Sequence, residues 1–185
     1  MPFDHFNFIA PLYNRVGDYS SLDVMTAAAD LPTKGILLDV GGGTGRVASA
    51  LRDEAAHVFV ADVSLGMLRF AASKPGLRAA AAQSELLPFP DNSFDRVIMV
   101  DAFHHVIHQA NTARELFRVL KPGGRIVIEE PDIRSFGVKL IALGEKLLLM
   151  RSHFLAPDQI VALFDSSRVN IISKDSSAWI VVEKI

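Results

Sequence analysis

The chain has 185 residues, a formal net charge of −2 and no cysteine. This length is typical of a single domain, and without cysteine the chain has no disulfide, thiolate metal site or cysteine-dependent chemistry. The small net charge, with no run of basic residues, gives no electrostatic reason to expect a nucleic-acid partner. The first residues lack the pattern of a secretory signal, so we expect a cytoplasmic protein.

Apolar runs alternate with helical patterns along the chain. The apolar runs predict parallel strands at 35–40, 57–62, 77–83, 94–100 and 125–130. The apolar spacing between them predicts helices that include 44–55 and 111–120, the latter closed by Lys-Pro-Gly-Gly at 121–124. A helix at 158–164 and a hairpin of 169–173 and 178–184 should end the fold. This alternation predicts an α/β fold with a doubly wound sheet and helices on both of its faces.

A glycine-rich loop follows the first predicted strand. Asp39 stands just before it, and Gly41, Gly43 and Gly45 lie within the loop. Glycine lets the backbone turn sharply and approach a ligand without interference from a Cβ atom. A strand, a glycine loop and a helix in this order predict a pocket for a nucleotide-type cofactor. A glycine-rich turn without chemical meaning is the alternative.

The spacing of these glycines argues against two common cofactors. A dinucleotide fingerprint places its third glycine where this chain has Arg46, so a nicotinamide oxidoreductase is disfavoured. No Gly-Lys-Ser/Thr follows the loop, so the Walker lysine is absent. Asp39 could hold an ammonium group and would repel a phosphate. Asp62, which ends the second predicted strand, could accept hydrogen bonds from adenosine hydroxyls. It could equally cap the following helix, as could Ser64.

Four sequence blocks, in a fixed order along the chain, resemble those of a known family. They are Leu-Asp-Val-Gly-Gly-Gly-Thr-Gly at 38–45, Ala-Asp-Val-Ser-Leu-Gly-Met-Leu at 61–68, Leu-Leu-Pro-Phe-Pro-Asp-Asn-Ser-Phe-Asp at 86–95 running into Phe-His-His-Val at 103–106, and Glu-Leu-Phe-Arg-Val-Leu-Lys-Pro-Gly-Gly-Arg at 115–125. With these blocks the chain resembles class I S-adenosylmethionine-dependent methyltransferases, and most of all those of ubiquinone and menaquinone biosynthesis. The likeness is close over 34–130 and looser at both ends.

The resemblance implies a Rossmann-like sheet of seven strands in the order 3-2-1-4-5-7-6, with strand 7 antiparallel. It also implies S-adenosylmethionine as the cofactor and S-adenosylhomocysteine as the product. One domain would span 1–185, with an N-terminal cap segment at 1–33, a cofactor-binding core at 34–130, a specificity insert at 131–157, and a closing helix and hairpin at 158–185. A homo-oligomer is compatible with the sequence.

Positions in the first two blocks carry over to the cofactor. By resemblance, residues from Asp39 to Gly45 surround the methionine part, and Asp62 binds the ribose hydroxyls. Val63 and Met67 would flank the adenine ring. The methyl group on the sulfonium is already activated, so the protein's task in this family is alignment.

Three further segments complete the predicted cofactor site. Gln83, followed by Ser84, stands where the family usually has an aspartate, and its side-chain carbonyl can still accept a hydrogen bond from the adenine amino group. The residues after the fourth strand would line the pocket; they are Asp101, Ala102 and Phe103. Tyr13 lies in an Ala-Pro-Leu-Tyr-Asn segment that in the family folds over the cofactor. The departure at Gln83 and Ser84 keeps an alternative open, a non-catalytic relative that acts as a sensor or partner subunit.

The segment 136–150 is apolar around most of its circumference and carries three charged residues. It is too short and too polar to span a bilayer, so we expect no stable membrane insertion. It could be a helix buried against the sheet edge, a lid over an apolar acceptor, or a contact with a membrane surface. From this segment we expect the methyl acceptor to be a small, apolar or amphipathic metabolite.

His104, His105 and His108 follow the fourth strand, at the rim where such sheets bind ligands. They could be structural, bind the acceptor or act as a general base. They could also share a metal, with oxygen ligands taken from Glu129, Glu130 or Asp132. Histidine suits a general base near neutral pH. We therefore predict His105, followed by His104, as catalytic residues and predict no metal.

Overall fold

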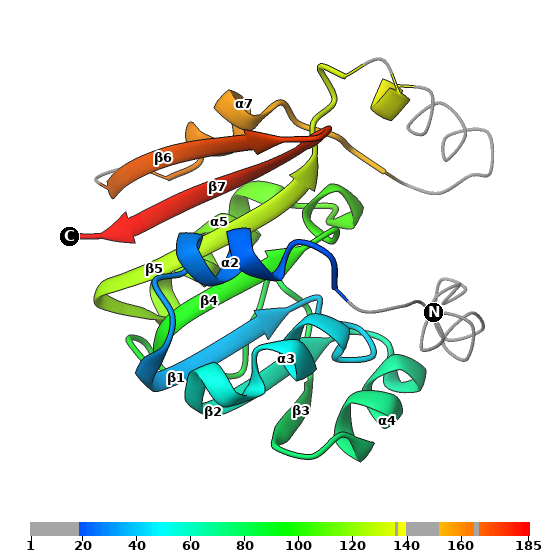
Figure 1. The fold of residues 1–185 in the computed structure, drawn as a ribbon, viewed down its shortest axis with the longest axis vertical. Coiled ribbons are helices and arrows are strands. Elements are labelled where there is room, and N and C mark those ends of the chain that lie inside the picture. Colours follow the sequence, from blue (N-terminus) through cyan, green and yellow to red (C-terminus); the bar gives the residue numbers. More distant parts are fainter. Residues whose placement is uncertain (1–18, 136, 140–151, 165–166) are drawn as a thin grey trace.

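The computed structural model describes residues 19–135, 137–139, 152–164 and 167–185 (Figure 1). Seven strands form one sheet in the order β3-β2-β1-β4-β5-β7-β6. They are β1 (Thr33–Val40), β2 (Ala55–Asp62), β3 (Leu77–Ala81), β4 (Phe94–Val100), β5 (Leu120–Pro131), β6 (Ser167–Lys174) and β7 (Ser177–Lys184). Strand β7 runs antiparallel to both of its neighbours, whereas β1 to β5 pair in parallel. The predicted strand order and the antiparallel strand are confirmed.

Helices cover both faces of the sheet, as predicted. The described helices are α2 (Leu22–Ala28), α3 (Arg46–Ala50), α4 (Leu65–Ser73), α5 (Gln109–Val119) and α7 (Pro157–Val161). Helices α2, α3 and α4 pack into one buried cluster, and α5 and α7 pack into the other. Figure 1 shows α2 and α3 on the near side of the sheet and α5 on the far side. No helix in the described part of the chain is long and apolar enough to cross a membrane.

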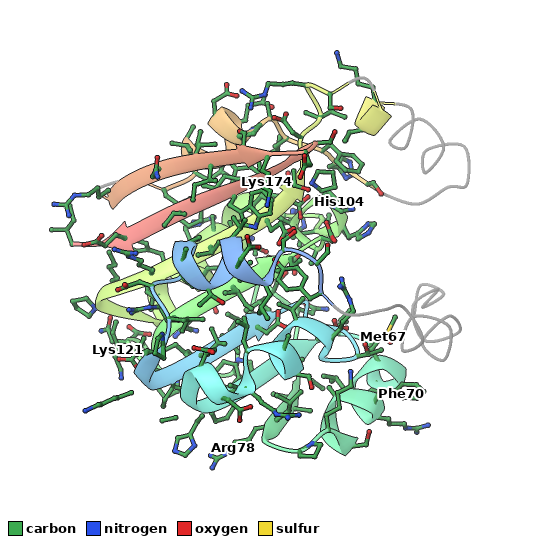
Figure 2. The ribbon with its side chains drawn as sticks, viewed as in Figure 1. Met67, Phe70, Arg78, His104, Lys121 and Lys174 are labelled. Carbon is green, nitrogen blue, oxygen red and sulfur yellow. The ribbon has the colours of Figure 1, made fainter. Side chains whose placement is uncertain are left out.

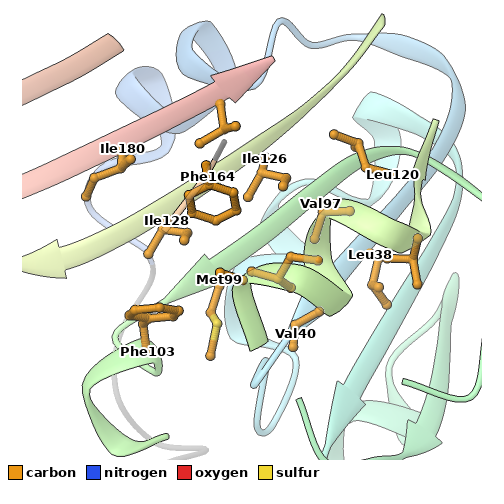
Figure 3. Close-up of a cluster of buried hydrophobic side chains, with 14 of the residues drawn as sticks. Leu38, Val40, Val97, Met99, Phe103, Leu120, Ile126, Ile128, Phe164 and Ile180 are labelled. Atoms are coloured by element: carbon orange, nitrogen blue, oxygen red, sulfur yellow. The ribbon is translucent and has the colours of Figure 1, made fainter. Parts of the chain in front are cut away.

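The central strands have continuous apolar sequences because both of their faces are buried. Successive side chains in a strand point to opposite faces, and β4 shows this clearly. Val97 and Met99 belong to the cluster under α5, whereas Ile98 between them belongs to the cluster under α2, α3 and α4. Figure 3 shows the first of these clusters, in which Leu38 and Ile126 from the neighbouring strands surround Val97.

Several predicted boundaries differ from the structure, and two differ most. The helix expected over 44–55 ends at Ala50, a 3₁₀ turn follows at Arg52–Glu54, and β2 begins at Ala55. The apolar spacing continues because Leu51, between the helix and the turn, is buried. Strand β5 begins at Leu120, so the expected loop 121–124 belongs to it. A register shift against β4 accommodates this stretch, in which Gly123 has a φ of +75°.

The core under α5 gives a first testable prediction. Leu116 is fully buried, and Leu116→Ala should lower the free energy of unfolding by roughly 2–5 kcal/mol through lost burial and a residual cavity. Urea unfolding measures the loss. Leu65→Ala is the matched control, because Leu65 is 62% exposed and its removal should cost about 0.5 kcal/mol or less. Equal losses in the two variants would contradict the assigned core.

The carboxyl ends of the parallel strands meet at one edge of the sheet. Figure 2 shows Met67 and His104 near this edge, whereas Lys121 lies at the opposite end. Strand order reverses between β1 and β4, since β1 pairs with β2 on one side and with β4 on the other. Open α/β sheets bind their ligands outside the strand ends at such a switch point.

Candidate functional site

A pocket of about 580 Å³ lies at the switch point, outside the carboxyl ends of β1, β2 and β4. This volume is typical of sites for small molecules. Most of the residues predicted from the sequence line it. They are Asp39, Gly41, Gly43, Asp62, Val63, Met67, Gln83, Ser84, Asp101, Ala102 and His105. The structure thus brings together residues from four separate sequence segments.

Four predicted residues are not among those that line the pocket. Tyr13 lies outside the described residues, as does most of the predicted helix at 136–150. Phe103 is buried in the core under α5. A Cβ atom on Gly45 would lie 2.8 Å from Leu77 Cδ1, so this glycine lets loop and sheet pack closely behind the pocket. His104 is also buried, for a reason given below.

The glycine loop forms one wall through its backbone. Gly41 and Gly43 have φ values of +70° and +56°, a backbone conformation that residues other than glycine rarely adopt. A Cβ atom on Gly41 would lie 2.7 Å from Ala102 Cβ, so loop and opposite wall are in close contact there. On Gly43 its nearest neighbours would be Met67 Sδ at 3.9 Å and Asp62 Oδ2 at 4.0 Å, both in pocket residues. Glycine therefore leaves space here that a side chain would fill.

Asp39 supplies a buried carboxylate beneath this loop. It is 1% exposed, and neither of its oxygens makes a hydrogen bond of normal geometry in the described structure. Burial, followed by the charge of Asp62, raises the pKa of Asp39 from 3.8 to about 7, although the Ala48 backbone N–H lies near enough to lower this pKa slightly. Burying a carboxylate without a partner is costly unless a cation or donor meets it. Asp39 is therefore suited to hold a cationic group of a ligand.

Asp62 joins the end of β2 to the glycine loop. Its Oδ2 accepts a hydrogen bond from the Gly43 N–H at 2.8 Å, and its Oδ1 accepts one from the Ser64 N–H at 2.8 Å. Ser64, and not Asp62, is the N-cap of α4, because its hydroxyl accepts from the Met67 N–H. The helix-cap alternative for Asp62 is therefore wrong, and its carboxylate belongs to the pocket wall.

Glu130, at the end of β5, fixes the loop after β4. Its Oε1 accepts hydrogen bonds from the N–H groups of Ala102 at 3.0 Å and Phe103 at 2.8 Å. Its Oε2 lies 2.5 Å from His104 Nδ1, in a buried hydrogen bond. The His104 ring stacks on Phe154 at 4.3 Å between ring centres. These contacts explain why His104 lies outside the pocket.

His105 is the predicted catalytic histidine that reaches the pocket. Its Nδ1 lies 3.3 Å from the Ser152 hydroxyl, close enough for a hydrogen bond that would orient the ring. His108 also lines the pocket and precedes α5. These two residues carry the imidazole groups that line the described pocket.

The acidic residues considered as metal ligands each have another partner. The Tyr19 hydroxyl donates to Glu129, Glu130 pairs with His104, and Asp132 pairs with Arg134 at 2.6 Å. Burial raises the pKa of Glu129 to about 7. Among the residues that the structure describes, no group of three or more His, Asp or Glu side chains is arranged to hold a metal ion.

Sequence reasoning missed several pocket residues. Glu85 and Ile107 line the wall, and nothing in their local sequence distinguishes them from other loop residues. Arg46 lines it too, although we considered it only as an obstacle to a dinucleotide. Its position directly after the glycine loop was the available signal. The Ser84 hydroxyl lies 3.0 Å from that of Thr112, which holds this wall against α5.

Comparison with known proteins supports the reading of the motifs. Residues 38–128 match the model of the methyltransferase domain family. A demethylmenaquinone methyltransferase from Clavibacter sepedonicus is 38% identical over 185 aligned residues, which cover 94% of this chain and 70% of the relative. A ubiquinone/menaquinone biosynthesis C-methyltransferase from Stutzerimonas stutzeri is 33% identical, over 66% of this chain and 53% of the relative.

Solved structures show the same fold. An S-adenosylmethionine-dependent methyltransferase from Thermotoga maritima superposes with a TM-score of 0.79 and 22% sequence identity, covering 97% of this chain and 98% of that one. The curated relatives are longer proteins. The chain spans between 40 and 70% of their length.

Proposed function

The chain belongs to the class I S-adenosylmethionine-dependent methyltransferases, and from this premise we propose that it transfers a methyl group to a ring carbon of a demethylmenaquinone-type quinol. The main structural support for methyl transfer is the pocket at the switch point, in which the buried Asp39 lies under a glycine loop. The names of the relatives supply the acceptor class. The pocket at the switch point favours this function over the non-catalytic alternative, for which we expect an apolar protein-binding patch instead.

The residues present fit the cofactor. The orphaned Asp39 carboxylate is suited to the ammonium group of the methionine part, and the space at Gly43 admits its chain. The other roles follow the pocket walls. Asp62 accepts from the ribose hydroxyls, Val63 and Met67 flank the adenine, Gln83 accepts from its amino group, and Asp101 and Ala102 close the pocket with their backbone.

When bound, the cofactor supplies a methyl group activated by its sulfonium. The contribution of the protein is to hold the attacking ring carbon in line with that methyl group. Positioning of this kind can remove on the order of 7–11 kcal/mol from a barrier. Apolar side chains of the pocket wall, such as Met99, Val106 and Ile107, exclude water around an apolar ring.

We assign the proton transfer to His105. An aromatic carbon becomes a better nucleophile when the neighbouring hydroxyl loses its proton, and the ring must later lose the hydrogen that the methyl group replaces. An imidazole can accept a proton near neutral pH, and that of His105 lines the pocket, with its Nδ1 3.3 Å from Ser152 Oγ. His104 supports this residue from the adjacent position, through its contacts with Glu130 and Phe154.

Under this proposal, different segments of the chain have different roles. Residues 34–130 bind the cofactor, and 131–157 form the acceptor side, of which Ser152 and Phe154 already contact the loop after β4. The role of Tyr13 in the cap segment at 1–33 stays a prediction, because Tyr13 lies outside the described residues. The closing helix and hairpin at 158–185 complete the single domain.

Calorimetric titration with S-adenosylhomocysteine tests the cofactor. We expect micromolar binding, none with NAD, and a large loss in Asp62→Asn, which keeps one acceptor oxygen for the backbone. Asp53→Asn is the matched control, because the Asp53 side chain is 88% exposed. If the wild-type protein bound neither S-adenosylhomocysteine nor NAD, the proposed function would be contradicted.

The acceptor is tested separately, with a methyl-labelled cofactor. We expect label to enter chemically reduced demethylmenaquinone and to be absent from menaquinone, whose ring carbon is already methylated. Cofactor binding without transfer to the reduced quinone would reject the acceptor and keep the cofactor assignment.

A further inference from the structure

Arg46 lies in the cofactor pocket without a role in the proposed function. It follows the glycine loop directly as the first residue of α3, and its side chain is half-buried. Within the described residues that line the pocket, it is the one lysine or arginine. A cation in this position must therefore shape what kind of charge the pocket accepts.

The guanidinium group has no polar partner in the described structure. It donates no hydrogen bond and forms no ion pair there. Instead, its Cζ lies 5.7 Å from the centre of the Tyr19 ring, in a cation–π contact. The Tyr19 hydroxyl is in turn held by the buried Glu129. Tyr19 therefore supports the guanidinium from one side and leaves its N–H donors available.

The charge of Arg46 acts on three carboxyl groups to which it forms no ion pair in the described structure. The charge of Arg46 lowers the pKa values of Asp39, Asp101 and Glu129, although burial, the larger effect in each case, raises them. All three are thus near enough to feel the cation. The pocket holds a cation with free donors and, beneath the glycine loop, an anion with free acceptors.

This pairing matches the amino-acid end of the proposed cofactor. That end is a zwitterion, with an ammonium and a carboxylate on one carbon atom. The planar guanidinium presents its donors in a fork that fits a carboxylate at two points, which an ammonium group cannot do. Asp39 cannot serve the carboxylate, since like charges repel.

We propose that Arg46, supported by the ring of Tyr19, binds the carboxylate of the methionine part of the cofactor, while Asp39 takes its ammonium group. The inference rests on the proposed function and adds a binding residue to it. The pocket then recognises the free amino-acid end of the ligand by one charge of each sign. An adenosine ligand that lacks the carboxylate should lose this recognition.

A ligand and a residue can be changed in turn to test this pairing by calorimetry. The ligands are S-adenosylhomocysteine and its decarboxylated analogue, which keeps the amine, the thioether and the adenosine. We expect Arg46→Gln to lower the affinity for S-adenosylhomocysteine by roughly 10- to 100-fold, as for a lost hydrogen bond between charged groups. Its affinity for the decarboxylated analogue should not change. Arg52→Gln is the matched control, because Arg52 pairs with Asp53 outside the pocket and should leave both affinities unchanged.

The outcomes separate the inference from the function on which it rests. Equal weakening of both ligands in Arg46→Gln, or no weakening of either, would overturn the role of Arg46. A wild-type protein that binds neither ligand would reject the cofactor itself. Thermal unfolding checks that each variant is folded. If the glutamine variant is not, Arg46→Lys keeps the charge and loses the fork, and it should weaken S-adenosylhomocysteine alone.

Discussion

Asp39→Asn should raise the stability of the ligand-free protein at pH 8 and remove most of its affinity for S-adenosylhomocysteine. Burial, together with the charge of Asp62, raises the pKa of the Asp39 carboxyl from 3.8 to about 7. In the unfolded chain the same carboxyl ionises near its ordinary pKa of about 3.9. Between these pH values the folded protein keeps a proton that the unfolded chain has lost. The free energy of unfolding therefore falls as the pH rises through this range.

Asparagine removes this dependence, because it carries no titrating group. The gain in the free energy of unfolding should be near zero below about pH 4, grow up to about pH 7 and reach on the order of 2–4 kcal/mol above it. Urea unfolding across this pH range measures the difference between variant and wild type. Asp53→Asn, on the exposed surface, should show no such trend.

Binding should change in the opposite direction in the same variant. The ionised Asp39 meets the ammonium group of the ligand, and asparagine offers it no charge. S-adenosylhomocysteine should therefore raise the melting temperature of the wild-type protein at pH 8 and have little effect on the variant. If the variant were less stable than the wild type at pH 8, the fold itself would be stabilising the ionised carboxylate. The proposed role of Asp39 would then be wrong.

The second large effect is expected from Gly41→Ala, which should weaken cofactor binding strongly, whereas Gly123→Ala should preserve it. Both glycines have positive φ values, +70° and +75°, so an alanine at either position costs about 1–2 kcal/mol of backbone strain. They differ in the space around them. A Cβ atom at Gly41 would lie 2.7 Å from Ala102 Cβ, and at Gly123 it would meet no atom within 4 Å.

The collision at Gly41 must displace one wall of the pocket. Ala102 cannot move freely, because Glu130 holds its N–H. We expect the affinity of Gly41→Ala for S-adenosylhomocysteine to fall by at least about tenfold, and that of Gly123→Ala to stay at the wild-type value. Calorimetry gives the affinities and urea unfolding gives the strain. Equal affinities in the two variants would show that the contact between Gly41 and Ala102 does not shape the pocket.

Much of the fold could be predicted because its strands are buried on both faces. The continuous apolar run of β4, for example, is distinctive even in one sequence. The order of the strands and the antiparallel β7 came from the resemblance, since no local pattern encodes which strands pair. Helix α3 shows the limit, because Leu51 continues the helical spacing although it lies past the end of the helix, just before the 3₁₀ turn that leads to β2.

The candidate site also contains residues that could be predicted from the sequence and residues that could not. Residues of the glycine loop, and Asp62 after β2, could be predicted because they stand at fixed places beside strand ends. The choice between His104 and His105 could not, since it depends on Glu130, a partner 26 residues away on the next strand. The importance of Arg46 depends on Tyr19 and on three carboxyl groups from other segments. Such relations exist only after the chain has folded.

Glu129 and Glu130 are neighbours in β5 that serve opposite faces of the sheet, the first bonded to Tyr19 and the second to His104. This arrangement limits which changes in chain length the protein can accept during evolution. Losing or gaining one residue between Arg125 and Glu129 would turn the side chains of Glu129 and Glu130 to the opposite faces of the sheet. Each carboxylate would then be separated from its partner and would face the other apolar layer. Related chains should vary in length elsewhere, for instance at the tight turn of Asp175 and Ser176, where the backbone already leaves the ladder.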